Sequence, residues 1–249
     1  MVRSIMPNGH LRFTMLGGLL LPTLDGEYCR VHTRNGQVYT GTILSTSPSV
    51  HVFKDSRSKV RDEDNMYIRL DENVKSKKDT INLGISNGDI VAVDTKFQFT
   101  ESGYVKTRFL DDKASVFILI TYLQRLKEQN KIPACNLKII FTTYEEVGHG
   151  ASQIPNLDEL LAVDMGCIGT DLECTEEQVS ICAKDGSGPY DYEMTSKLIE
   201  LAKTNKLNYA VDIYPFYSSD ASAALRGGAD IKAALIGAGI HASHGMERT

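Results

Sequence analysis

Cysteine is scarce in this sequence, and its spacing speaks against two kinds of site. The five cysteines form no C-x-x-C pair, and their number is odd. A disulfide framework and a cysteine-ligated zinc site are therefore both disfavoured, and free thiols are typical of a reducing cytosol. We predict that the protein is cytoplasmic.

Long apolar runs and an excess of positive charge are missing as well. The longest apolar runs, residues 17–21 and 116–120, are far too short to cross a bilayer. No apolar stretch of the signal-peptide kind follows Met1. The net charge of -5 offers no attraction to nucleic acid or to an anionic membrane. We therefore expect neither of these partners.

The 249 residues, 42% of them hydrophobic, are enough for a sizeable core, and the pattern of the chain changes near residue 98. Residues 7–97 alternate short apolar runs with turn signals, which predicts a small, mostly β, barrel-like domain. The signal at Asn35-Gly36 predicts a hairpin between Tyr28–Arg34 and Gln37–Leu44. Within this region, only residues 61–72 are compatible with a helix.

Residues 98–249 alternate strand-like runs with helices. Apolar residues at helical spacing, or start and stop signals, predict helices over Lys113–Glu128, Pro189–Asn205 and Asp220–Arg226. This alternation predicts an α/β fold with a mixed, largely parallel sheet and helices on both faces.

Acidic residues or histidines follow four strand-like runs in this second region. The pairs are Gly103–Leu110 before Asp111-Asp112, Leu137–Tyr144 before Glu145-Glu146, Glu159–Val163 before Asp164, and Ile231–Ile236 before His241 and His244. Because parallel strands bring their carboxyl ends to one edge of a sheet, we expect these side chains to converge. Carboxylate and imidazole ligands suit Zn, Co or Mn, so the pattern indicates a metal site.

Simpler readings of these residues stay open at this stage. Two glutamates after a strand are compatible with a solvated loop, and Asp111 or Asp112 is well placed to cap the following helix. A glycosidase that uses Glu145 and Glu146 is disfavoured. Its two carboxyls must lie about 5 to 9.5 Å apart on either side of the sugar bond, whereas neighbours on an extended chain point to opposite faces.

Six short motifs in order cover nearly the whole chain: Arg12–Gly18 (RFTMLGG), Leu110–Lys113 (LDDK), Thr143–Gly148 (TYEEVG), Ala162–Asp164 (AVD), Ser219–Ala221 (SDA) and Ser243–Thr249 (SHGMERT). With them the sequence resembles the M42 family of metallo-aminopeptidases, which includes glutamyl and tetrahedral aminopeptidases. The resemblance implies a zinc-peptidase-like fold with an inserted small β-barrel domain. Residues 1–6 would be a remnant strand of the catalytic domain, 7–97 the dimerisation domain and 98–249 the metallopeptidase domain.

The resemblance also implies a role for each site residue. It implies two divalent metal ions (Zn, Co or Mn) that Asp111 bridges. Glu146 and His244 would complete one metal site, and Asp164 would bind the second ion. Glu145 would be the general base, and a metal-bridged water the nucleophile, in removing N-terminal residues from peptide substrates. A homo-oligomer, in which dimers assemble into a dodecamer, is implied as well.

Two features leave activity and specificity open. The family's first metal histidine lies in a His-x-Asp motif, which this sequence lacks, and the chain resembles a member truncated at both ends. The alternative is therefore a catalytically incomplete member that acts as a scaffold or binding subunit. Asp220 is a candidate substrate-binding residue, since a helix N-terminus there would favour an anionic substrate side chain. A plain capping loop explains the same residues equally well.

Overall fold

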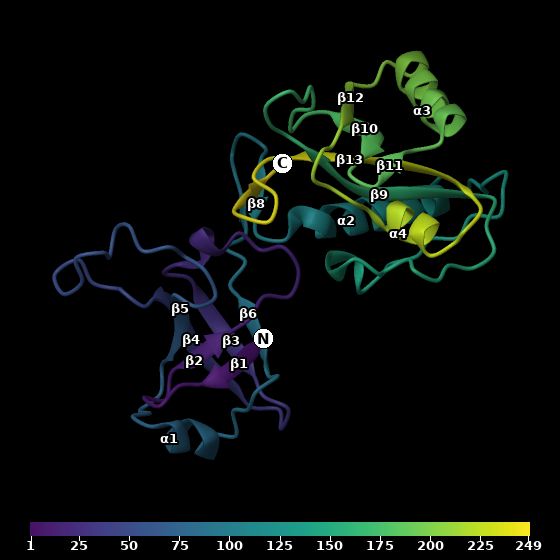
Figure 1. Ribbon diagram of the computed structural model, residues 1–249. Coiled ribbons are helices and arrows are strands. Elements are labelled where there is room, and N and C mark those ends of the chain that lie inside the picture. Colours follow the sequence, from purple (N-terminus) through teal and green to yellow (C-terminus); the bar gives the residue numbers. More distant parts are fainter. The chain divides into compact units, whose positions relative to one another are not determined.

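The computed structural model describes residues 1–249, and the chain forms two compact units, residues 1–95 and 96–249 (Figure 1). The predicted change of pattern at residue 98 lies two residues from this boundary. None of the helices combines the length and the apolar content that crossing a bilayer requires.

The first unit is built on one antiparallel six-stranded sheet in the order β1-β2-β5-β4-β3-β6. Its strands are β1 Val2–Ile5, β2 Leu11–Phe13, β3 Tyr28–His32, β4 Val38–Ser45, β5 Met66–Leu70 and β6 Ile90–Val93. In β3, Cys29 and Val31 are buried between exposed neighbours, which is the alternation of a half-buried strand. The hairpin predicted around Asn35-Gly36 is confirmed by the β3–β4 pairing. The barrel-like closure stays a prediction.

Three segments of the first unit differ from what the sequence predicted. β1 pairs with β2, and its Val2 and Ile5 pack into the first unit's core, whereas residues 1–6 had been assigned to the second domain. Residues 66–70 form β5 and no helix, because their buried side chains alternate with a period of two. The helix α1, Lys77–Asn82, was not predicted, although Ser76 and Asp79 form a capping box at its start.

The second unit contains a mixed five-stranded sheet, which confirms the predicted α/β class. Its strands are β9 Glu159–Cys167, β10 Val179–Asp185, β11 Gly188–Pro189, β12 Tyr209–Ile213 and β13 Lys232–Ile240. β9 runs parallel to β13 and β10 parallel to β12, whereas β10 is antiparallel to β13 and β11. Gly237 lies opposite Asp164, and a Cβ there would come within 2.1 Å of the Asp164 carbonyl oxygen, so this close pairing requires glycine.

Three helices pack on this sheet: α2 Leu110–Glu128, α3 Tyr192–Thr204 and α4 Asp220–Arg226. The predicted bounds of α4 are confirmed, with Ser219 as N-cap and Gly227 at the end. α3 begins later than predicted because Asp191 caps it, while Pro189 belongs to β11. A separate small sheet joins β14 Glu247–Arg248, β8 Val105–Thr107 and β7 Gln98–Phe99.

The predicted buried strand over Leu137–Tyr144 is wrong. These residues form no ladder with any strand, and Leu137, Ile140 and Phe141 are 45%, 43% and 46% exposed. High strand propensity reflects packing on a pleated surface and needs a neighbour to supply it. No neighbouring strand pairs with these residues, so propensity alone has not produced a strand.

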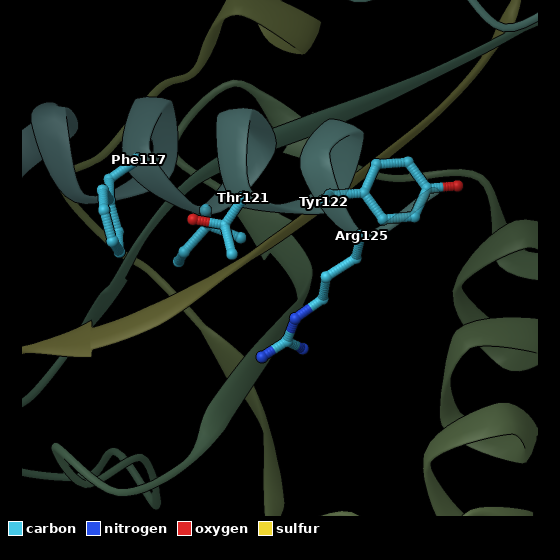
Figure 2. A pocket seen from close by; sticks show the side chains of 5 residues that line it. Phe117, Thr121, Tyr122 and Arg125 are labelled. Atoms are coloured by element: carbon cyan, nitrogen blue, oxygen red, sulfur yellow. The ribbon is translucent and has the colours of Figure 1, made fainter. Parts of the chain in front are cut away.

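The helix α2 carries apolar side chains on its exposed surface. Phe117 is 70% exposed, and with Ile118, Thr121, Tyr122 and Arg125 it lines a shallow pocket on the helix (Figure 2). The pocket has no acidic residue or histidine in its lining. An exposed apolar patch of this kind is typical of contact with another surface and offers no group for metal or acid–base chemistry.

Candidate metal centre

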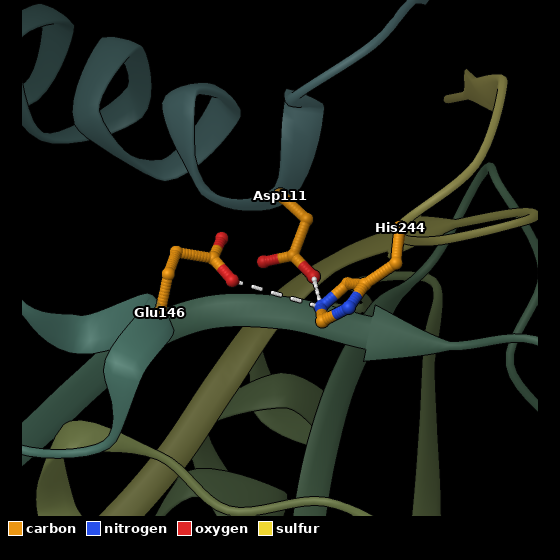
Figure 3. A group of neighbouring side chains, drawn as sticks. All are labelled: Asp111, Glu146 and His244. Carbon is orange, nitrogen blue, oxygen red and sulfur yellow. Dashed lines mark ion pairs between the residues drawn. The ribbon is translucent and has the colours of Figure 1, made fainter. Parts of the chain in front are cut away.

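Three predicted ligands lie together although they come from three separate segments of the second unit. Asp111 stands in the first turn of α2, Glu146 in the 3-10 turn Glu145–Val147, and His244 in the loop after β13 (Figure 3). His244 Nε2 is 3.2 Å from Asp111 Oδ2 and 3.7 Å from Glu146 Oε2. Their candidate ligand atoms all lie within 4.8 Å of one another, which is compatible with one shared cation.

A second group consists of three aspartates and shares Asp111 with the first. Oxygen atoms of Asp111, Asp112 and Asp164 lie within 4.8 Å of one another. Asp164 is buried, and its Oδ1 accepts a hydrogen bond of 2.7 Å from the backbone N–H of Met165. Asp112 Oδ1 is buried and has no hydrogen-bond partner. A buried carboxylate oxygen in that position costs free energy unless it gains a partner such as a cation.

The role that the sequence suggested for Asp112 needs correction. Neither Asp111 nor Asp112 caps α2 with its side chain: the N-cap residue is Phe109, and no side chain makes the capping hydrogen bond. Asp111 and Asp112 themselves have non-helical backbone angles. Asp112 is instead turned toward Asp111 and Asp164, so it joins the acidic group that sequence reasoning had not assigned to it.

The route by which the side chains converge also differs from the prediction. Of the four strand-like runs, only the two that became β9 and β13 lie in one sheet, and β8 belongs to another. Asp164 lies inside β9, which continues to Cys167. The expected meeting of four parallel strand ends is therefore wrong, while the side chains still gather around Asp111.

The pKa values of the acids around Asp111 show how unfavourable their negative charges are without a cation. Burial, followed by the charge of Asp164, raises the pKa of Glu145 to about 8. Burial is likewise the first cause of the raised pKa of Asp112, Asp164 and Glu146, and neighbouring carboxylates add to it. A divalent cation would relieve this repulsion, and carboxylate with imidazole is a suitable ligand set for one. The residues present therefore fit a metal ion.

Glu145 and Asp220 lie beside these groups and belong to neither. Asp220 Oδ2 accepts a 2.5 Å hydrogen bond from Thr142, and its Oδ1 is buried next to Gly150. The charge of Asp220 also contributes to the raised pKa of Glu145. Asp220 therefore faces the segment that carries Glu145. His241 is likewise outside both groups.

The metal-free protein should lose stability as the pH rises from about 5 to about 8. Glu145 titrates near 4.5 in the unfolded chain and near 8 in the folded one, so the folded state holds more protons across this range. Stability is fully present below the unfolded pKa and is lost as the pH rises through the folded pKa. Discounting for partial exposure, we expect a loss of about 2 kcal/mol, or ~4–8 °C in Tm.

Thermal melts of metal-free protein at several pH values measure this effect, and protein loaded with Zn²⁺ is the control. The loaded protein should show a much flatter Tm over the same range, because the ion neutralises the carboxylates. A metal-free Tm that rises toward pH 8 would contradict the assigned repulsion.

The sequence family settles what kind of protein carries this cluster. The whole chain, residues 1–249, matches the family described as M42 glutamyl aminopeptidase. The chain belongs to the M42 family. The predicted family is thereby confirmed, and with it the class of enzyme, since M42 proteins are metal-dependent aminopeptidases that hydrolyse peptides.

Individual M42 relatives agree with this assignment. YhfE of Bacillus subtilis (strain 168) is 45% identical over 251 residues, which cover 100% of this chain and 72% of YhfE. A TET aminopeptidase from Thaumarchaeota archaeon SCGC AB-539-E09 superposes with a TM-score of 0.82 at 21% identity, over 99% of this chain and 72% of that one. The TET1 peptidase of Pyrococcus horikoshii gives a TM-score of 0.80 at 23% identity, over 99% and 74%. These two structures show that the M42 fold is shared.

Proposed function

We propose that this chain is a two-metal aminopeptidase that removes N-terminal residues from peptides. The observation that carries the proposal is that Asp111 belongs to both groups of candidate ligands. Asp111, Glu146 and His244 would hold one ion. Asp111 and Asp164 would hold the other, with Asp112 as a further oxygen donor beside them. Carboxylate and imidazole ligands serve Zn, Co and Mn, so each of these ions fits.

Metal ions bound here would supply Lewis-acid polarisation of the scissile carbonyl and would lower the pKa of a water. The chain's own residues supply the rest. A carboxylate shared by two cations, as proposed for Asp111, stays ionised and holds them close together. Met165, through its backbone N–H, fixes the carboxylate of Asp164 on β9.

Glu145 is the proposed general base. It precedes the ligand Glu146 in the same turn, belongs to neither ligand group and has a pKa raised to about 8. A base of that pKa takes the proton of the attacking water efficiently near neutral pH and can return it to the leaving amine. The peptide C–N bond then breaks as the new C–O bond forms, and the proton leaves with the amine.

Asp220 is proposed to contribute to substrate binding through the loop that carries Glu145. Its hydrogen bond to Thr142 ties the start of α4 to the segment just before Glu145. Its other oxygen is buried beside Gly150, so direct contact with a substrate would require that loop to move. The nature of the preferred N-terminal residue would then depend on how this loop is held.

A homo-oligomer is the proposed assembly. The Pyrococcus horikoshii relative is described as assembling into a tetrahedron or a large octahedral shell. In the first unit Leu16, Leu20, Val52 and Phe53 are exposed, which leaves apolar side chains available for contact between copies. We assign dimerisation to this unit and assembly of the dimers to a dodecamer.

Metal analysis combined with a substrate panel tests the proposal. Protein loaded with Zn²⁺, Co²⁺ or Mn²⁺ should hold about two ions per chain and cleave aminoacyl-nitroanilides, but not the same compounds acetylated at the amine. A scaffold or binding subunit would hold well under two ions and show no turnover with any of them. Light scattering on the same preparations gives the mass of the assembly, and a monomer would contradict the proposed oligomer.

A further inference from the structure

Glu247 is a buried carboxylate that the proposed mechanism does not use. It is 2% exposed and lies in the short strand β14, opposite Thr107 of β8. β14 is also held from the other side, where the backbone N–H and C=O of Arg248 bond to His241. Charged side chains are almost never fully buried without partners, so the partners of Glu247 indicate what it does.

Those partners are the backbones of two proposed metal ligands. Glu247 Oε2 accepts a 3.1 Å hydrogen bond from the N–H of Asp111, and Oε1 accepts a 2.7 Å bond from the N–H of His244. Each oxygen of one carboxylate therefore holds one ligand-bearing residue. Hydrogen bonds to an ionised acceptor are shorter and about twice as strong as neutral ones.

At Asp111 this hydrogen bond does the work of a helix cap. The first N–H groups of a helix have no partner inside it and are usually satisfied by the side chain of the N-cap residue. Phe109, the N-cap residue of α2, has no side chain that can do so. Glu247 satisfies the N–H of Asp111 from a position 136 residues away in the sequence.

At His244 the hydrogen bond holds a backbone conformation that the residue rarely adopts on its own. His244 has a φ of 64°, in the left-handed region that favours glycine. Such a conformation persists where surrounding contacts determine it. The bond to Glu247 is one such contact, and it fixes the direction from which the imidazole approaches Asp111.

We propose that Glu247 is the positioning residue of the metal centre, a single carboxylate that sets Asp111 and His244 at the spacing an ion requires. The inference rests on the proposed function, because it assigns both residues as ligands. Residues behind metal ligands orient them, and their loss typically weakens metal binding about 10- to 100-fold.

Two substitutions separate positioning from the simple effect of a nearby negative charge. Glu247→Gln keeps the size of the side chain but has one acceptor oxygen, so one of the two N–H groups loses its partner. Glu247→Asp keeps the charge but is one methylene shorter and cannot span both N–H groups. Positioning predicts weaker metal binding in both variants, whereas a charge effect predicts it only in Glu247→Gln.

Co²⁺ binding to the folded full chain, measured by competition with a chromophoric chelator, provides the test. We expect the Co²⁺ dissociation constant to rise about 10- to 100-fold in both variants, with a changed visible Co²⁺ spectrum. Glu176→Gln is the matched control, since it breaks the pair between Glu176 and Arg248 of the same strand and should bind Co²⁺ as the wild type does. Wild-type affinity in either Glu247 variant would overturn the inference.

Backbone amide resonances of the metal-free protein give a readout that does not depend on the proposed function. The amide protons of Asp111 and His244 should both shift upfield in Glu247→Asp and Glu247→Gln as their hydrogen bonds weaken. If the wild-type chain bound no Co²⁺, the proposed function would fail, and unchanged amide resonances would separately overturn the role of Glu247.

Discussion

Replacing Glu145 with glutamine should lower kcat for an aminoacyl substrate by about 10²- to 10⁴-fold while metal content stays unchanged. Glutamine keeps the shape of the side chain but cannot accept a proton from the attacking water. Glu145 belongs to neither group of candidate ligands, so the ions should remain bound. The measurement is steady-state kinetics together with metal analysis of the same sample.

Stability gives this prediction an internal control. Glu145 is partly buried among like charges, so removing its charge should raise the Tm of metal-free protein near pH 8. A loss of activity in a more stable protein is then not a folding defect. Glu128→Gln, at the exposed end of α2, should keep wild-type activity and Tm. Normal turnover in Glu145→Gln would show that the base is another residue.

Replacing Asp111 with asparagine should remove both ions, with activity falling to about 1% or less. Asp111 is the one residue common to both groups, and an amide oxygen is a weaker ligand for a dication than a carboxylate. Substitutions of residues in only one group should be milder: His244→Ala should release one ion and Asp164→Asn the other. Metal analysis after gel filtration distinguishes these patterns.

The exposed residue Asp158 offers a matched control, since Asp158→Asn makes the same chemical change away from the cluster and should retain both ions. An Asp111→Asn variant that still carries two ions would mean that the two groups do not share this carboxylate. The proposed metal centre would then have to be rebuilt around other residues.

Local signals allowed the sequence to predict those parts of the fold that are determined locally. α4 was predicted because its cap, Ser219, and its stop, Gly227-Gly228, lie next to it in the chain. The β3–β4 hairpin was predicted because Asn35-Gly36 specifies the turn. The helix α1 was missed although it has a capping box, because six residues are too few to show a helical period.

Features that depend on distant partners were not predictable in the same way. Residues 137–144 have strand propensity, but a strand forms only with a ladder partner, and they have none. Asp112 carries the same local signal as Asp111, so nothing nearby shows that both turn toward Asp164. Glu247 was missed because its partners lie at the start of α2 and in the loop after β13.

The small ladder between β8 and β14 has a consequence for how tightly ions can be held. Bringing together two points 136 residues apart in a flexible chain costs an entropy of closure worth about 4 kcal/mol. Here the pairing of Glu247 with Thr107 and of Arg248 with Lys106 closes that loop when the unit folds. Cations entering the site therefore meet ends that are already joined, and their binding free energy need not supply the closure.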